Sequence, residues 1–379
     1  MTQLTLVNVR ICTPDPAPAD GWLRIEDGVI AGFGRGQPEP GGVVIDVAGQ
    51  WLLPGFVDTH CHGGGGAALY SGQVDDVVRA ALTHLRQGTT TLIASVATMQ
   101  LDRMLAAAAA IAEAVSSAPN IRGIHFEGPF LSPQRRGAQT ESALLIPDEQ
   151  VFARLMEAAG GLAISMTIAP ELPGAIELIE RHHQLITFAV GHTDDDGTRT
   201  RQAFDAGART ATHLFNAMPA MTHRRPGPVG AALLDDRVGC ELIADGIHLS
   251  PEALVIASRT AGLERTMLVT DAMAATGLGD GDYSFADRHV EVRDGVARLR
   301  GTETLAGSVH FLSDALATVV RVLDLSLPQA TALVAGNAAR HYDWQDRGTV
   351  AVGKTADLVV MSDDLTVAGV YLAGVPARA

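Results

Sequence analysis

The middle of the chain alternates short apolar runs with helical stretches. Eight runs have the length and apolar character of buried strands: 52–57, 90–95, 121–127, 163–169, 185–191, 209–214, 239–245 and 265–271. Helices are predicted between most of them, including 75–86, 101–115, 148–159 and 251–261. Buried strands that alternate with helices form parallel sheets. The pattern therefore predicts an α/β fold, a (β/α)8 TIM-like barrel, with an open doubly wound sheet as the alternative.

Both ends of the chain have the pattern of short strands. Residues 4–9 alternate with period two, and residues 22–30 predict two strands around an Asp27-Gly28 turn. Residues 356–361 and 367–375 have the same character. We therefore expect a small β-sandwich domain built from residues 1–53 and 341–379, and a barrel domain of residues 54–340.

Two long segments interrupt the alternation. Residues 128–147 follow the third predicted strand, and residues 272–304 follow the eighth and predict a hairpin around Arg293-Asp294-Gly295. Loops at the carboxyl ends of barrel strands shape the binding site in such folds. Candidate chemical residues also follow many of the predicted strands. In an open doubly wound sheet they would gather at the one point where the strand order reverses, so their distribution favours the barrel.

The composition narrows the class of function. The 379 residues carry a net charge of −15, which argues against nucleic acid and anionic membranes as main partners. The sequence has no apolar stretch long enough for an ordinary membrane helix, and we expect no secretory signal. Three scattered cysteines (Cys12, Cys61 and Cys240) are too few for a disulfide framework, so the cytoplasm is the expected location.

A His-x-His pair comes directly after the first predicted strand. In an extended segment, the side chains of His60 and His62 point the same way, so two imidazoles can converge on one ion. Neutral imidazole is a ligand for zinc, iron and other first-row ions. Two histidines in a polar loop are the alternative interpretation, and the pair alone does not decide between them.

Three further candidates end the third, fifth and sixth predicted strands. Glu127 is a carboxylate at the tip of a buried strand, where it needs a metal ion or a salt bridge to Arg135 or Arg136. His192 and His213, taken singly, are more typical of satisfied core histidines. Together the three predict a metal site, because three protein ligands with an open position are typical of catalytic sites.

Polar residues also follow the last strands. His248 is a candidate for orienting a substrate or polarising a carbonyl, and a surface loop histidine is the alternative. Asp271 is a candidate general base and acid that takes a proton from water and passes it to a leaving amine, and a capping or salt-bridging aspartate is the alternative. Arg224 and Arg225 lie in the loop after the sixth strand and form a candidate anion site.

Several strings along the chain match a known family. They are 54–58 (Pro-Gly-Phe-Val-Asp), 125–130 (His-Phe-Glu-Gly-Pro-Phe), 191–193 (Gly-His-Thr), 212–219 (Thr-His-Leu-Phe-Asn-Ala-Met-Pro), 244–248 (Ala-Asp-Gly-Ile-His), 269–272 (Val-Thr-Asp-Ala) and 305–308 (Leu-Ala-Gly-Ser). Over nearly its whole length the chain resembles the amidohydrolase superfamily and, within it, the N-acetylglucosamine-6-phosphate deacetylases. The resemblance implies a barrel with a small β domain from both termini.

The resemblance also implies roles for individual residues. Glu127, His192 and His213 would hold a divalent metal, Asp271 would be the general acid and base, and His248 would contact the substrate and help to polarise its acetamide carbonyl. Substrate contacts would come from Ala138, Gln139, Asn216, Ala217, Arg224, Leu305 and Ala306. In this family the arginine is lent by the other subunit of a homodimer. Gln139 stands where some members carry histidine.

The resemblance leaves the number of ions open. Some members replace the His-x-His pair and bind one metal, whereas His60 and His62 are both present here, so a second ion bridged by Glu127 is an option. Zinc is the first expectation, with Fe²⁺ or another first-row ion as alternatives. The only lysine, Lys354, lies outside the predicted barrel. This excludes the branch of the superfamily that bridges its metals with a carbamylated barrel lysine.

The predicted reaction is hydrolysis of N-acetyl-D-glucosamine 6-phosphate to D-glucosamine 6-phosphate and acetate. Two alternatives stay open. The substrate could be N-acetylgalactosamine 6-phosphate, which needs the same chemistry. A non-catalytic sugar-phosphate sensor could also use the same scaffold, because a fold does not fix a function.

Overall fold

The structure is a computed structural model that describes residues 3–13, 21–36, 38 and 41–377. It divides into two compact units. The terminal unit comprises Met1–Asp58, His84–Thr91 and Phe311–Ala379, and the barrel unit comprises Thr59–Thr83 and Leu92–His310. Segments from both ends of the sequence therefore share one unit. The predicted domain limits, at 53/54 and 340/341, stay a prediction.

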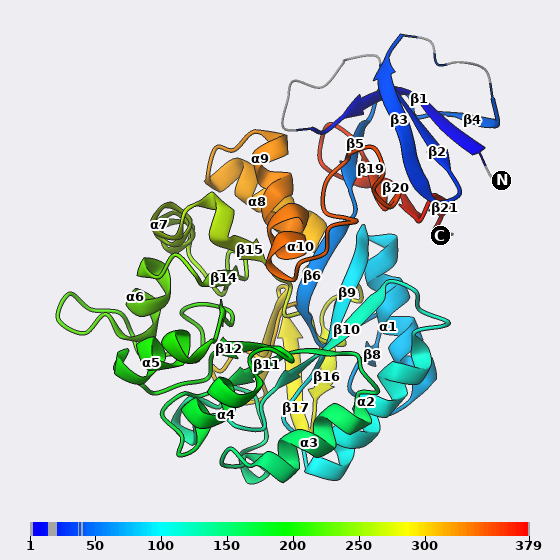
Figure 1. Ribbon diagram of the computed structural model, residues 1–379. Coiled ribbons are helices and arrows are strands. Elements are labelled where there is room, and N and C mark those ends of the chain that lie inside the picture. The colour runs from blue at the N-terminus through cyan, green and yellow to red at the C-terminus, as the bar shows by residue number, and fades with distance from the viewer. Residues whose placement is uncertain (1–2, 14–20, 37, 39–40, 378–379) are drawn as a thin grey trace. The chain divides into compact units, whose positions relative to one another are not determined.

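Eight parallel strands form the barrel (Figure 1). In sheet order they are β15 (Thr266–Leu268), β14 (Gly239–Leu242), β13 (Thr210–Ala211), β12 (Thr187–Val190), β11 (Ala163–Ile168), β10 (Ile121–Glu127), β9 (Thr89–Val96) and β6 (Phe56–Cys61). Backbone hydrogen bonds join the two ends of this row: Asp271 N–H donates to His60 O, and His62 N–H donates to Ala272 O, both at 2.8 Å. The sheet closes on itself, which confirms the predicted (β/α)8 fold class.

Helices follow most of the barrel strands. They are α1 (Val74–Arg86), α2 (Leu101–Ala114), α3 (Glu149–Ala158), α4 (Ala175–His182), α5 (Thr198–Ala206), α6 (Gly227–Leu234) and α7 (Pro251–Ala261), with short 3-10 turns η1 (Pro133–Arg135), η2 (Glu141–Ala143) and η3 (Leu263–Arg265). The Asp148 carboxylate accepts backbone hydrogen bonds at the start of α3, and the Ser250 hydroxyl does so at the start of α7. The four predicted helices match α1, α2, α3 and α7 to within one residue.

The first predicted strand, 52–57, is wrong because it joins parts of two strands. β5 (Trp51–Pro54) pairs antiparallel with β19 (Leu358–Met361), whereas β6 begins at Phe56. Gly55 separates them, and a Cβ at this position would lie 2.0 Å from Thr90 Oγ1. As a result, His60 lies inside β6 and His62 comes directly after it.

The segment after β15 contains the predicted hairpin and one further strand. β17 (Arg288–Arg293) and β18 (Val296–Leu299) pair antiparallel across Asp294-Gly295, where both residues adopt positive φ angles, as tight hairpin turns require. β16 (Gly281–Phe285) pairs with the other side of β17. A separate small ribbon is formed by β7 (Gly63–Gly64) and β8 (Ala67–Ala68).

The terminal unit is built around a second sheet. Its order is β21 (Val375–Pro376), β20 (Val367–Leu372), β19, β5, β1 (Gln3–Ile11), β2 (Gly21–Glu26) and β3 (Val29–Arg35), with β4 (Val43–Asp46) against β1. The strands come from both ends of the sequence, and β2 and β3 meet at the Asp27-Gly28 turn, as predicted. The unit also contains α8 (Leu312–Val322), α9 (Leu327–Thr331), the π-helical η4 (Ala332–Gly336) and α10 (Asn337–His341).

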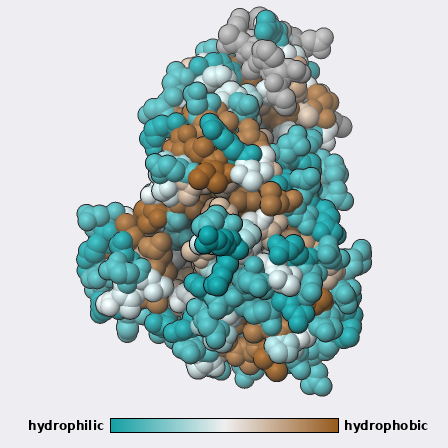
Figure 2. Space-filling view, turned by 90° about the vertical axis from the view of Figure 1, so that its left-hand side faces the viewer, coloured by the Kyte–Doolittle hydropathy of each residue, from teal (hydrophilic) through white to brown (hydrophobic). Residues whose placement is uncertain are grey.

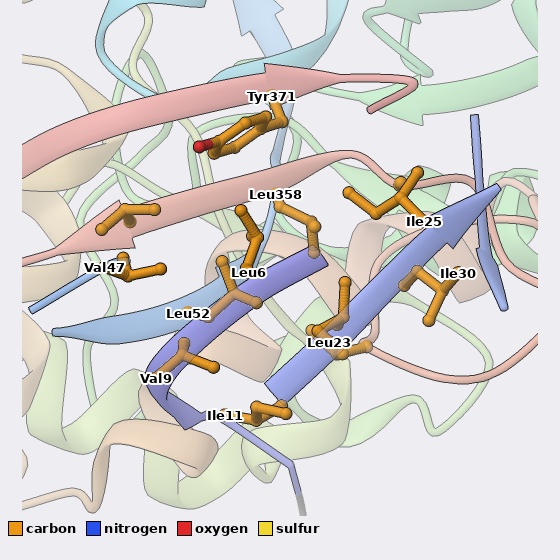
Figure 3. Packing of buried hydrophobic residues seen from close by; sticks show 13 residues of the cluster. Leu6, Val9, Ile11, Leu23, Ile25, Ile30, Val47, Leu52, Leu358 and Tyr371 are labelled. Carbon is orange, nitrogen blue, oxygen red and sulfur yellow. The ribbon is translucent and has the colours of Figure 1, made fainter. Parts of the chain in front are cut away.

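Aliphatic side chains form the core of the terminal unit. Figure 3 shows Leu6, Leu23, Leu52 and Leu358 close together, on strands from the two ends of the sequence. All four are fully buried. Burial of a leucine side chain contributes about 1.5–3 kcal/mol, so this cluster stabilises the pairing of the two ends.

Every helix in the described part of the chain is too short or too polar to cross a membrane. Figure 2 shows one face of the molecule, on which hydrophobic residues form patches between larger hydrophilic areas. Val43, Ile146 and Leu234 are exposed large apolar side chains that lie far apart in the sequence. Such exposure is ordinary for folded proteins, whose surfaces contain much apolar area.

Candidate active site

The candidate chemical residues gather at the carboxyl ends of the barrel strands. His60 lies in β6, Glu127 is the last residue of β10, and His192, His213 and Asp271 follow β12, β13 and β15 within three residues. The last three adopt left-handed φ angles of 46°, 27° and 48°. Such a conformation costs on the order of 1–3 kcal/mol per residue and persists where surrounding contacts enforce it. These turns end β13 and β15 earlier than the predicted strands 209–214 and 265–271.

Glu127 lies between two pairs of imidazoles. Its Oε1 is 3.0 Å from His192 Nε2 and 3.1 Å from His213 Nε2. On the other side, Oε1 is 3.3 Å from His60 Nε2, and Oε2 is 3.1 Å from His62 Nε2. The Nε2 atoms are 3.1 Å apart within each pair. The structure thus brings together all five residues that were predicted as metal ligands.

Asp271 adds a second carboxylate to this cluster. Its Oδ1 is 3.3 Å from His62 Nε2 and 3.6 Å from His60 Nε2. Asp271 also lines the cleft that opens above the cluster. A group in this position can exchange a proton with a molecule that is bound in the cleft.

Three of the four imidazoles turn their Nδ1 atoms toward oxygen acceptors. The pairs are His62 with Ser95 O at 3.2 Å, His192 with Arg135 O at 2.8 Å, and His60 with Glu241 Oε2 at 3.4 Å. These oxygens accept hydrogen bonds, so the Nδ1 atoms carry protons and the Nε2 atoms present lone pairs. Lone pairs only 3.1 Å apart repel unless a cation lies between them. The donor set therefore fits one or two divalent metal ions.

The buried charges determine which groups are ionised. Burial alone would raise the pKa of Glu127, but His60, His192 and His62 lower it well below its usual value. When no cation occupies the cluster and the imidazoles carry protons, burial still raises the pKa of Asp271, but the hydrogen bond with His62 and the charge of His60 lower it. Both carboxylates are therefore ionised at neutral pH, and their negative potential favours a bound cation.

Most of the predicted substrate-binding residues line the cleft. Beside the cluster, its walls consist of Gly137, Ala138, Gln139, Asn216, Ala217, His248, Phe285, Thr304, Leu305 and Gly307. Gln139 also donates a hydrogen bond to Glu127 Oε2 and accepts one from Thr98 N–H at 2.8 Å. Two predicted residues do not line the cleft of this chain: Ala306 is fully buried, and Arg224 is exposed in the loop after β13.

A buried carboxylate holds His248 in place. His248 Nδ1 is 2.7 Å from Asp245 Oδ2, and the backbone N–H groups of Ile247 and His248 donate to Asp245 Oδ1, both at 2.8 Å. Burial alone would lower the pKa of His248, but the hydrogen bond with Asp245 and its charge raise it. The imidazole is thus fixed at the wall of the cleft and kept readily protonated.

The sequence-based predictions assigned no role to Glu241, Asp245 or Phe285. Glu241 and Asp245 carried a local signal, since both are acidic residues within or at the end of an apolar run. Phe285 carried none: it comes from the inserted sheet and packs on His62 with ring centroids 5.2 Å apart. Only the fold brings that residue to the site.

Comparisons with known proteins agree with this geometry. A model of the amidohydrolase family matches residues 51–376. The N-acetylglucosamine-6-phosphate deacetylase of Bacillus subtilis is 36% identical over 96% of this chain and 94% of that protein. The N-acetylgalactosamine-6-phosphate deacetylase of a Shewanella strain is 36% identical over 85% of this chain and 82% of that protein. A mutant N-acetyl-D-glucosamine-6-phosphate deacetylase from Mycobacterium smegmatis, solved in complex with N-acetyl-D-glucosamine-6-phosphate, has a TM-score of 0.94 at 36% identity and covers 100% of both chains.

Proposed function

The chain belongs to the amidohydrolase family, and from this premise we propose that it hydrolyses N-acetyl-D-glucosamine 6-phosphate to D-glucosamine 6-phosphate and acetate. The observation that carries the proposal is the position of Asp271. Its carboxylate lies 3.3 Å from His62 Nε2 and faces the same cleft as Glu127 and His192. Amide hydrolysis needs such a proton carrier beside an electrophilic centre.

The metal centre in this proposal has two parts. Glu127, His192 and His213 would hold one divalent ion, and His60, His62 and Glu127 would hold another. Zinc suits imidazole and carboxylate donors and is the ion we propose, with Fe²⁺ as an alternative. When bound, a divalent cation supplies Lewis acidity that polarises a carbonyl and lowers the pKa of water.

Asp271 and His248 would carry the protons. The pKa of Asp271 is lowered, so its carboxylate is ionised at neutral pH and would accept the proton of the attacking water and return it to the departing amine. His248 donates its Nδ1 proton to Asp245, and its raised pKa favours a second proton on Nε2. That proton would stabilise the carbonyl oxygen as negative charge develops on it.

The phosphate end of the substrate points to a second subunit. Among the described residues, those that line the cleft include no arginine or lysine, although a phosphate group calls for a cation. We propose a homodimer in which Arg224 of the partner subunit reaches this cleft, while Ala138, Gln139, Asn216 and Leu305 contact the sugar. We also propose a cytoplasmic location, since three scattered cysteines are too few for a disulfide framework.

Acetate release from N-acetyl-D-glucosamine 6-phosphate tests the proposed function. The pure protein with added zinc should release acetate, and a chelator should stop the reaction. Asp271→Asn should lower kcat by about 10²–10⁴-fold, because the amide cannot carry the proton. Equal rates for the two proteins would remove Asp271 from the mechanism. Tight binding of the substrate without turnover, with several metals, would instead support a sugar-phosphate sensor.

One comparison favours a second candidate substrate. The Shewanella deacetylase named for N-acetylgalactosamine 6-phosphate has the same identity, 36%, as the Bacillus protein named for N-acetylglucosamine 6-phosphate, over a shorter part of the chain. The two substrates differ only at the sugar 4-hydroxyl and need the same chemistry. The ratio of kcat/KM for the two epimers decides between them, and a larger value for the galacto epimer would replace our first choice.

A further inference from the structure

Glu241 is a buried carboxylate that the proposed reaction does not use. It lies in β14, between Cys240 and Leu242, and is only 4% exposed. Thr59 Oγ1 donates to Glu241 Oε1 at 2.9 Å, and Glu241 Oε2 is 3.4 Å from His60 Nδ1. A buried carboxylate is costly unless hydrogen bonds and opposite charge compensate it. The imidazole of His60 joins this carboxylate to the cluster of Nε2 atoms on its other side.

The four imidazoles of the cluster differ in what their Nδ1 atoms face. Those of His62 and His192 face neutral backbone carbonyls, Ser95 O and Arg135 O. Within the described residues, His213 Nδ1 has no hydrogen-bond partner. His60 alone in this set faces a carboxylate. Such a partner fixes the orientation and tautomer of an imidazole and makes its far nitrogen a stronger donor to a metal.

We infer that Glu241 is a positioning residue that selectively strengthens the metal subsite of His60, His62 and Glu127, and so allows this chain to hold a second ion. The inference rests on the metal centre of the proposed function. It follows from the charge balance of the cluster: two divalent ions bring four positive charges, and Glu241 adds a third carboxylate to Glu127 and Asp271. In the subsite of His192 and His213, by contrast, neither Nδ1 atom faces a carboxylate among the described residues.

Zinc titration of metal-free protein tests the inference without any measurement of turnover. Glu241→Gln keeps the size of the side chain and removes its charge. Calorimetry should show two ions per subunit in the unaltered protein. In Glu241→Gln, the Kd of one site should rise about 10–100-fold while the other stays unchanged. Anomalous scattering at the zinc edge should assign the weakened site to His60 and His62.

Two further variants test the same contact if Glu241→Gln folds poorly. Thr59→Val removes only the hydrogen bond to Glu241 Oε1, so it should weaken the same site by a smaller factor. In a His60→Ala background, Glu241→Gln should cause no additional loss of affinity, since the two residues act as a unit. As a matched control, Asp357→Asn removes a buried carboxylate of the terminal unit, 3.4 Å from Arg347, and should leave both Kd values unchanged.

Three results would overturn the inference. They are an unchanged Kd for both ions in Glu241→Gln, an equal loss at both sites, and binding of a single ion by the unaltered protein. The last result, together with acetate release, would leave the proposed function intact. Conversely, two ions whose affinity depends on Glu241, in a protein that releases no acetate, would support the inference and contradict the proposed function.

Discussion

Asp245 and His248 form a buried ion pair at the wall of the cleft, with 2.7 Å between Oδ2 and Nδ1. Their side chains are only 2% and 5% exposed. Two backbone N–H groups fix the other oxygen of Asp245. The imidazole therefore cannot rotate without leaving a buried carboxylate unpaired, which is strongly unfavourable.

Replacing Asp245 with asparagine should lower the pKa of His248. Burial then disfavours the imidazolium without a carboxylate to oppose it. A neutral His248 no longer offers a proton on Nε2, so kcat should fall by about 10²–10³-fold, as for the loss of one oxyanion donor. NMR titration of the His248 ring and acetate release measure the two effects. An unaltered pKa in Asp245→Asn would disprove the coupling.

The same pair predicts how stability depends on pH. The pKa of His248 is raised on folding, so its contribution is complete below about pH 6.5 and is lost as the pH rises through the folded pKa. The pKa of Asp245 is lowered, so its contribution is complete above about pH 3.9 and is lost as the pH falls through the folded pKa. The difference in unfolding free energy between the unaltered protein and Asp245→Asn should be greatest between these values. Urea unfolding of both proteins at pH 3, 5.5 and 9 measures this difference. A difference that does not change with pH would contradict the prediction.

Removal of metal should destabilise the protein. An ion that binds only the folded state at 1,000 times its Kd adds about 4 kcal/mol to the unfolding free energy. Thermal unfolding with and without a chelator should therefore show a lower Tm for the chelated protein, restored by zinc. In Glu127→Gln, which lacks the charge between the imidazole pairs, the chelator should have little effect. A Tm shift of equal size in both proteins would place the ion elsewhere.

The core of the terminal unit predicts a matched pair of stability changes. Leu6 is fully buried among the clustered side chains, so Leu6→Ala should lower the unfolding free energy by about 2–5 kcal/mol. Val43, in β4, is 64% exposed, and Val43→Ala should change it by less than about 0.5 kcal/mol. Denaturant titration compares the two. Similar losses would mean that Leu6 contributes little to the packing.

The site could be predicted from the sequence to the extent that its residues occupy strand ends. The predicted strand 121–127 has the bounds of β10, so Glu127 was placed at the carboxyl end of a buried strand. The carboxyl ends of parallel strands lie together at one end of a barrel. His192 and His213 also stand at such strand ends, so they were predicted to lie near Glu127. The architecture was predictable for the same reason, because long apolar runs and helical stretches carry strong local signals.

Features that depend on contacts between distant segments could not be predicted. The end of β5 is set by Thr90, which leaves no space for a side chain at Gly55. Phe285 belongs to an inserted sheet and packs on His62. Glu241 contacts Thr59 and His60, which are far away from it in the sequence. Arg224 was predicted from a family resemblance, and its role across a dimer stays a prediction.

A protein designer who moved Glu127 and its four histidines to a different barrel would transfer the donor atoms without their convergence. His192, His213 and Asp271 each occupy a left-handed bend immediately after a strand, whereas a conventional strand end would send these side chains in other directions. A functional graft therefore has to include the left-handed backbone segments as well as the ligands. The host barrel also needs surrounding contacts that stabilise this backbone conformation.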